Sequence, residues 1–452
     1  MKKLLSRALI LCLAFSSLPL PSCSQSQSSG NKQANVLRIA SWDEYIDEGG
    51  EDSYNPSSSA LYKEFEVWYK AQTGKDITVE YITLQDNETM YNKIKMGDQY
   101  DLLCPSEYMI MKLAAEGLIQ KYPESFFDSN IENNYYTKNV SPYIKEVFEN
   151  GKLNDGSNWS EYAAGYMWGS TGFVFNPDKI PSETMKSWNA LTSPLCERKI
   201  TAKDNVRDSY FMGLGMYYEQ ELLALKTQYE CGEVSRETYK KILNEKMNDT
   251  SVETMNGVKK KLETMRSNLY GLETDEGKLD VIMGRLDASF QWSGDAVYII
   301  DEAEINSEND ETPLLLEYSI PESASNLWFD GWVMMNNANV EAATAFVNFL
   351  SIPTNVIRNM YYIGYTSCIG GAEVFSYVEE TYGCNDEEEY LTDYDLSYFF
   401  GENCILKTTQ EQTRRQLFAQ YPDANTIGRL VVMKYFDKET NTRANRMWNN
   451  IK

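Results

Sequence analysis

Several short segments of the chain place an aromatic side chain close to a carboxylate. Residues 42–45 are Trp-Asp-Glu-Tyr, residues 106–108 are Ser-Glu-Tyr, and residues 291–295 and 327–330 each set a tryptophan two or three positions before an aspartate. Residues 204–208 add an acidic turn. Such residues suit a flexible ligand with several ammonium groups. Each ammonium gains about 0.5–2 kcal/mol over an aromatic ring and donates charge-assisted hydrogen bonds to carboxylates. Taken singly, such a tryptophan is more often a packed core residue and such an aspartate a solvated loop or helix-cap residue. The indication of a ligand site comes from four such pairs at the ends of strands.

The net charge of −25 and the absence of histidine narrow the possible functions. Nucleic-acid binding is disfavoured because it requires basic surfaces. An acidic chain suits a cationic ligand, although such charge often serves only solubility. Without histidine, Ser-His and Cys-His nucleophiles and the commonest zinc ligand sets are excluded. A hydrolase that uses two carboxylates stays open. The composition nevertheless closes most routes to catalysis, so we expect a protein that is not an enzyme and that needs no cofactor or metal.

The first residues predict export. Lys2, Lys3 and Arg7 precede a short apolar run at 8–20, too short to cross a bilayer. We therefore expect a signal peptide over 1–22. Because Cys23 ends a segment that resembles the lipobox of bacterial lipoproteins, we expect it to carry a lipid; an ordinary signal peptide is the alternative. The polar residues 23–35 predict a flexible tether. The chain would then be exported to the periplasmic space or cell surface and would touch the membrane only through this anchor.

Six cysteines follow the predicted leader and anchor, at positions 104, 196, 231, 368, 384 and 404. In an exported protein an even number permits up to three disulfides, with 15 possible full pairings. No two of them have the CxxC spacing. They are interpreted as structural, either paired or buried singly.

The elements that must position the candidate residues alternate in type. Apolar or alternating segments at 36–40, 77–81 and 100–104 predict strands, and helical spacing predicts helices from Leu61 to Gly74, over 87–96 and over 108–116. A strand near 173–175 and a helix at 341–350 repeat the pattern later. This alternation predicts parallel α/β sheets in two lobes. Ligands of such sheets lie beyond the carboxyl ends of the strands, which is where the aromatic and acidic segments fall.

Several of these segments, taken together and in order, resemble the spermidine/putrescine-binding proteins of bacterial ABC transporters. The similar segments span most of the chain: WDEY at Trp42, DNETMY at Asp86, YDLLCPS at Tyr100, EGLIQ at Glu116, GYMWGSTGFVFN at Gly165, WSGD at Trp292, LWFDGW at Leu327, IGYT at Ile363 and YPDA at Tyr421. The resemblance implies a monomeric polyamine-binding component of an ABC importer, which delivers its ligand to the permease subunits. It also implies an α/β, two-lobed periplasmic-binding-protein fold of type II, with a hinge. Lobe 1 would comprise 36–171 plus 330–374, and lobe 2 would comprise 172–329 plus 375–452, with the ligand captured between them.

The resemblance also assigns ligand-binding residues. The positions that match the family's pattern are Trp42, Glu44, Tyr45, Ser106, Tyr108, Asn205, Asp208, Thr274, Trp292, Asp295, Trp328, Asp330 and Tyr365. Two positions depart from the spermidine-preferring branch, which has an acid where this chain has Asn205 and a glutamine where it has Met433. Both departures favour putrescine over spermidine. The alternative is that Glu44 or Glu107 takes over the role of the missing acid, in which case spermidine would still be bound well.

Two other functions compete with polyamine binding. Ferric iron is one, because Tyr361 and Tyr362 are adjacent and iron-binding relatives use adjacent tyrosines. A surface hydrolase with a carboxylate pair is the other. Insertions relative to the family lie near 130–160, 219–260 and 372–407, and the acidic run at 386–389 is interpreted as a solvated loop.

Overall fold

The computed structural model describes residues 35–153, 155–273, 277–308, 313–384 and 390–452. The predicted leader, Cys23, Thr274 and the acidic run 386–389 lie outside these ranges. Within them no single helix has both the length and the apolar composition of a membrane span. Helices α12 (Val340–Leu350) and α13 (Pro353–Ile363) together, bent by 74° at their junction, pass that test by length and composition alone.

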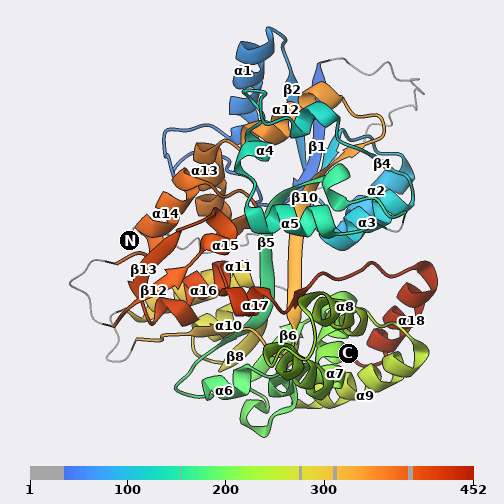
Figure 1. Cartoon of the computed structure of the whole chain (residues 1–452), viewed down its shortest axis with the longest axis vertical. Coiled ribbons are helices and arrows are strands. Elements are labelled where there is room, and N and C mark those ends of the chain that lie inside the picture. The colour runs from blue at the N-terminus through green and yellow to red at the C-terminus, as the bar shows by residue number, and fades with distance from the viewer. Residues whose placement is uncertain (1–34, 154, 274–276, 309–312, 385–389) are drawn as a thin grey trace, which may run out of the picture.

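One half of the molecule contains the first part of the chain (Figure 1). Its strands and helices are β1 (Val36–Trp42), α1 (Leu61–Thr73), β2 (Thr78–Leu84), α2 (Asn87–Met96), β3 (Leu102–Leu103), α3 (Glu107–Ala115), β4 (Ile119–Gln120), α4 (Tyr135–Asn139), α5 (Pro142–Asn150), α12 (Val340–Leu350) and α13 (Pro353–Ile363). Strand β1 pairs in parallel with both β2 and β3. The predicted strand–helix alternation of this half is therefore confirmed.

The other half contains the middle of the chain and its C-terminal helix. Its elements are α6 (Ser182–Met185), β6 (Ile200–Lys203), α7 (Val206–Glu230), α8 (Arg236–Met247), α9 (Val252–Asn268), β7 (Gly271–Glu273), α10 (Lys278–Ile282), β8 (Ala288–Trp292), α11 (Ser293–Ser307), β9 (Glu317–Ser319) and α18 (Lys438–Asn449). Strand β6 pairs in parallel with β7 and β8. A second α/β unit follows, with its own cluster of buried apolar side chains.

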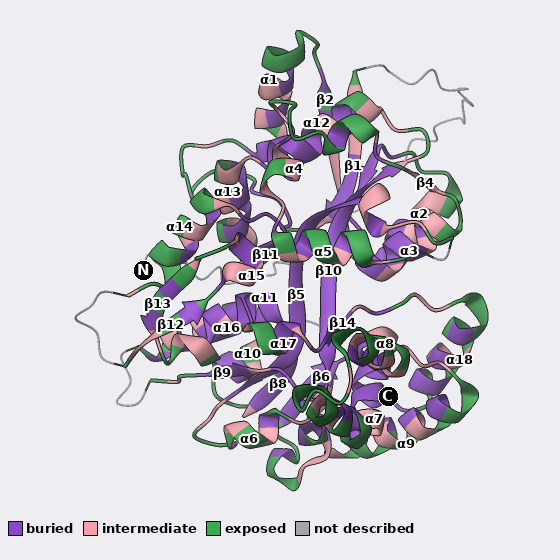
Figure 2. Cartoon of the chain, viewed as in Figure 1, coloured by how far each residue is buried: buried purple, intermediate pink, exposed green. Residues whose placement is uncertain are grey.

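Two long strands, β5 (Ala163–Phe175) and β10 (Ser325–Met335), connect the halves. They are antiparallel neighbours in one sheet of order β2-β1-β3-β10-β5-β8-β6-β7. Figure 2 shows both strands buried where they pass between the halves. The sequence predicted only 173–175 of β5. Its remainder is rich in glycine and buried on both faces, so it lacks the alternation that marks a half-exposed strand.

The chain after α13 lies against both halves. It forms β11 (Thr366–Ser367), α14 (Ala372–Tyr382), β12 (Leu391–Asp395), α15 (Ser397–Phe400), β13 (Ile405–Thr409), α16 (Gln416–Gln420), α17 (Ala424–Ile427) and β14 (Leu430–Val431). Helix α15 contacts α5 and helix α16 contacts α11, so this segment touches elements of each half. The exact lobe boundaries stay a prediction.

Three of the cysteines conform to one of the two alternatives left open by the sequence, burial as single thiols, whereas Cys231 fits neither alternative. Cys104, Cys196 and Cys368 are buried as free thiols, and Cys231 is an exposed free thiol. Burial raises the pKa of the Cys104 and Cys368 thiols well above the usual range, which keeps them protonated and unreactive.

Candidate functional site

Asp330 is the centre of one cluster of predicted residues. It lies in β10 beside an irregularity in the pairing with β5, between Asp330 and Gly331; such a bulge re-aims a side chain. Its Oδ2 accepts hydrogen bonds from Tyr45 Oη (2.7 Å) and Trp42 Nε1 (3.1 Å). Ser106, in an isolated β-bridge with Asp330, also donates to the carboxylate. Burial raises the pKa of Asp330, and these hydrogen bonds oppose that rise. Four predicted residues therefore meet around a buried carboxylate.

Glu107 is a second buried acid behind this cluster, with an exposed fraction of 3%. Its Oε2 accepts a hydrogen bond from the backbone N–H of Phe329 at 3.4 Å. Burial raises the pKa of Glu107 to about 8, with a further increase from Asp330 and an opposing effect from Arg207. At neutral pH this carboxyl is mostly protonated. It therefore does not supply the negative charge that we considered as a replacement for the acid absent at position 205.

Glu107 should make the stability of the protein depend on pH. Its pKa is about 8 when folded, against an ordinary 4.5. Between these values the folded chain holds a proton that the unfolded chain loses. The free energy of unfolding should therefore fall as pH rises through this window, by up to about 1.4 kcal/mol per pH unit relative to Glu107→Gln. Urea denaturation at pH 5, 6, 7 and 8 measures this difference. Glu149→Gln, which removes an exposed acid, is the control, and parallel curves for wild type and Glu107→Gln would contradict the assignment.

Asp295 is the centre of a second cluster, in the first turn of α11 directly after β8. Its Oδ1 accepts hydrogen bonds from Lys278 Nζ (2.8 Å) and Tyr365 Oη (3.1 Å), and its Oδ2 accepts one from Lys203 Nζ (3.4 Å). The Lys203 ammonium also lies 4.3 Å from the centre of the Trp292 ring. Lys203 was not among the predicted residues. The only sequence signal for it is its place at the end of a buried strand, directly before the acidic turn.

Asn205 and Asp208 lie at the N-terminus of α7 and also belong to this second cluster. Asn205 caps the helix by accepting the backbone N–H of Asp208 (2.7 Å), and its Nδ2 donates to Asp208 Oδ2 at 2.6 Å. Burial raises the pKa of Asp208, while Asn205, Lys203 and a hydrogen bond from Trp292 oppose the rise. The amide of Asn205 is thus engaged within the protein. Met433, the other departure, is buried in the apolar cluster of this half.

Aromatic rings connect the two clusters. The Tyr365 ring lies 6.0 Å from the Tyr45 ring and 5.4 Å from the Trp328 ring. The Tyr45 hydroxyl donates to Asp330, and that of Tyr365 donates to Asp295. A continuous path of side chains thus runs from one buried carboxylate to the other.

Two predicted residues lie away from this path. Tyr108 stacks against the Arg207 guanidinium at 4.1 Å and donates through Oη to Glu88, so it contacts the neighbour of Asp208 rather than either central carboxylate. Glu44 is exposed and has a positive φ of 51°. Thr274 lies outside the described residues.

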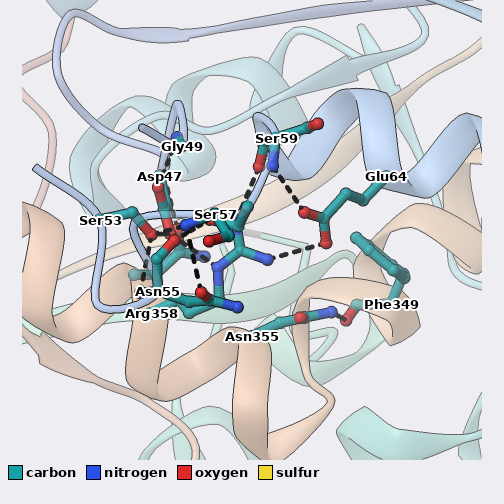
Figure 3. Close-up of polar contacts among 12 residues, drawn as sticks. Asp47, Gly49, Ser53, Asn55, Ser57, Ser59, Glu64, Phe349, Asn355 and Arg358 are labelled. Carbon is teal, nitrogen blue, oxygen red and sulfur yellow. Dashed lines mark hydrogen bonds and ion pairs between the residues drawn. The ribbon is translucent and has the colours of Figure 1, made fainter. Parts of the chain in front are cut away.

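A buried ion pair anchors the segment that presents Trp42 and Tyr45 (Figure 3). Arg358 Nε of α13 contacts Asp47 Oδ2 at 2.7 Å, and its Nη1 contacts Glu64 Oε2 at 2.8 Å. Asp47 is 0% exposed and also accepts hydrogen bonds from the N–H of Gly49 and the hydroxyl of Ser53. This network fixes the loop between β1 and α1 to α13.

One of the two adjacent tyrosines considered for ferric iron lies at the surface of the protein. The ring of Tyr361 lies 5.4 Å from that of Tyr54 at the surface. In the part of the chain that the structure describes, no group of three or more His, Cys, Asp or Glu side chains is placed to hold a metal ion.

Comparison with known proteins identifies the family. Residues 60–373 match the family of bacterial extracellular solute-binding proteins. The chain belongs to this family. Among its relatives, the spermidine/putrescine-binding periplasmic protein of Salmonella typhimurium is 26% identical over 333 residues, which cover 73% of this chain and 76% of the relative. The putrescine-binding periplasmic protein SpuD of Pseudomonas aeruginosa is 24% identical over 335 residues, or 72% and 76% of the two chains.

Solved structures of solute-binding proteins share the fold. The substrate-binding protein PotD of a spermidine/putrescine ABC transporter from Streptococcus pneumoniae matches with a TM-score of 0.60 and 23% identity, over 92% of this chain and 98% of its own. The TpPotD lipoprotein of Treponema pallidum matches with a TM-score of 0.59 and 16% identity, over 92% and 99%. The predicted two-lobed type II fold of periplasmic solute-binding proteins is confirmed.

Proposed function

We propose that this solute-binding protein captures a polyamine and delivers it to the permease of an ABC importer. The observation that carries the proposal is the buried carboxylate of Asp330, which the rings of Tyr45, Tyr365 and Trp328 connect to a second buried carboxylate, Asp295. A buried carboxylate beside aromatic surface matches an ammonium group that is joined to methylene groups. The ligands for which the relatives are named, spermidine and putrescine, support the same ligand class.

The remaining parts of the proposal concern how the protein works in the cell. The chain is a monomer without catalytic activity, exported by its leader and held to the membrane by a lipid on Cys23. Its two lobes, 36–171 plus 330–374 and 172–329 plus 375–452, close on the ligand through a hinge. Closure follows from ligand contacts on both lobes, since a ligand favours the conformation in which it makes more contacts.

Calorimetric titration of the purified chain tests the ligand class. Putrescine or spermidine should bind with a dissociation constant of about 1 µM or below, and the intrinsic tryptophan fluorescence should change because Trp42 and Trp328 line the proposed site. Ferric citrate should produce no such signal. Saturable binding of ferric iron without amine binding would favour the iron-binding alternative, and cleavage of a glycan would favour the hydrolase.

A further inference from the structure

Lys203 places a positive charge of the protein itself within the second cluster. Its side chain is 1% exposed, and its ammonium lies 4.3 Å from the centre of the Trp292 ring, 3.4 Å from Asp295 and 3.8 Å from Glu273. An ammonium over an aromatic ring and between two carboxylates is the environment that an amine ligand would require. In this protein a lysine side chain already fills that environment.

The carboxylates of Asp295 and Asp330 differ in whether cationic side chains of the protein balance their negative charge. Asp295 contacts the ammonium groups of both Lys203 and Lys278. Although burial acts to raise its pKa, these two cations hold the pKa of Asp295 below its usual range. Among the described residues that contact Asp330, by contrast, the hydrogen-bond donors are the neutral groups of Trp42, Tyr45 and Ser106. Of the two carboxylates, Asp330 is therefore the one that has no cationic partner among the described residues.

We propose that Lys203 is a specificity-determining residue, a built-in ammonium group that takes the amine position between Trp292 and Asp295. The inference rests on the proposed polyamine function. A ligand then anchors one ammonium at Asp330, and each further ammonium that it carries toward Asp295 meets the charge of Lys203. The site consequently selects amines with few ammonium groups, and putrescine is favoured over spermidine. This selection acts through Lys203, whereas Asn205 serves Asp208 and the helix cap.

Titration of wild type and Lys203→Met with butylamine, putrescine and spermidine tests the inference, because these ligands carry one, two and three ammonium groups. The variant should raise the affinity for spermidine relative to putrescine, and for putrescine relative to butylamine, by at least about fivefold each. Lys203→Met removes the ammonium group that pairs with the buried Glu273. The double variant Lys203→Met/Glu273→Gln also removes the carboxylate of Glu273, so that this carboxylate is not left buried without a cation. It should shift both ratios in the same direction.

Lys199→Met is the matched control. Lys199 lies four residues earlier and pairs with Asp287 at 3.1 Å with 53% of its side chain exposed, so this variant removes the same charge outside the site and should leave the ratios unchanged. Ratios that shift by less than fivefold in both Lys203 variants, while the amines still bind, overturn the inference and leave the proposed function standing. A wild type that binds no amine while Lys203→Met does supports the inference. Failure of all variants to bind any amine overturns both.

Discussion

Asp330→Asn should weaken the binding of putrescine about a hundredfold. Asparagine keeps the size of the side chain and an oxygen that can accept from Tyr45 and Trp42, but it removes the buried charge. The ammonium of the ligand would then enter the site without a counter-charge. Losing one charge from a buried hydrogen-bonded pair costs about 2–5 kcal/mol. A value near 3 kcal/mol corresponds to about two decades in the dissociation constant.

The same substitution should leave the fold intact, which separates binding from stability. Burial raises the pKa of Asp330 in the folded chain, so the ionised form is less favourable there than in water. Removing the charge should therefore not lower the free energy of unfolding at neutral pH.

Calorimetry and urea denaturation on one preparation measure both quantities. Asp76→Asn, which removes an exposed carboxylate paired with Lys70, is the control for bulk charge and should leave the affinity unchanged because distant exposed charges are screened. An equal loss of affinity in both variants, or a loss of affinity below tenfold in Asp330→Asn, would show that the ammonium group of the ligand does not bind at Asp330.

The local elements were predictable because each is marked by its own residues. Helix α1 has apolar residues at helical spacing and ends at Gly74, whose positive φ of 73° glycine adopts without strain. Strand β2 alternates as a half-exposed strand does. The positions that gather around Asp330 were predicted from the family resemblance, which supplies contacts between residues as distant as Trp42 and Asp330 that periodicity alone does not reveal.

Lys203 could not be predicted in the same way. In the sequence it is an ordinary lysine between a short strand and an acidic turn, a place that usually faces solvent. It becomes buried because β6 pairs in parallel with both β7 and β8, which end in Glu273 and Trp292. That arrangement depends on the order of strands in the sheet. Long-range strand pairing is the information that local patterns lack.

Arg358→Met should destabilise the protein more than any other substitution considered for this structure. The guanidinium of Arg358 contacts Asp47, Glu64 and the carbonyl oxygen of Ser59 (Figure 3). Methionine fills much of the same volume but leaves the carboxylate of Asp47 buried without its cation. Breaking a buried ion pair by removing one partner costs about 3–5 kcal/mol. The midpoint of urea denaturation should fall accordingly, with an unchanged slope if unfolding stays two-state.

A double-variant cycle with Asp47→Asn isolates the pair. If the cost of Arg358→Met arises from the unpaired charge on Asp47, the double variant Asp47→Asn/Arg358→Met should be more stable than the sum of the two single effects predicts. Lys75→Met is the control, since it breaks a pair with Glu341 that also joins distant parts of the chain but is exposed on both sides; exposed pairs contribute little to stability. Additive effects in the cycle would show that Arg358 does not stabilise the protein through Asp47. Coupling between the two residues, together with a parallel loss of ligand affinity in Arg358→Met, would show that the buried pair holds the loop carrying Tyr45 in position for Asp330.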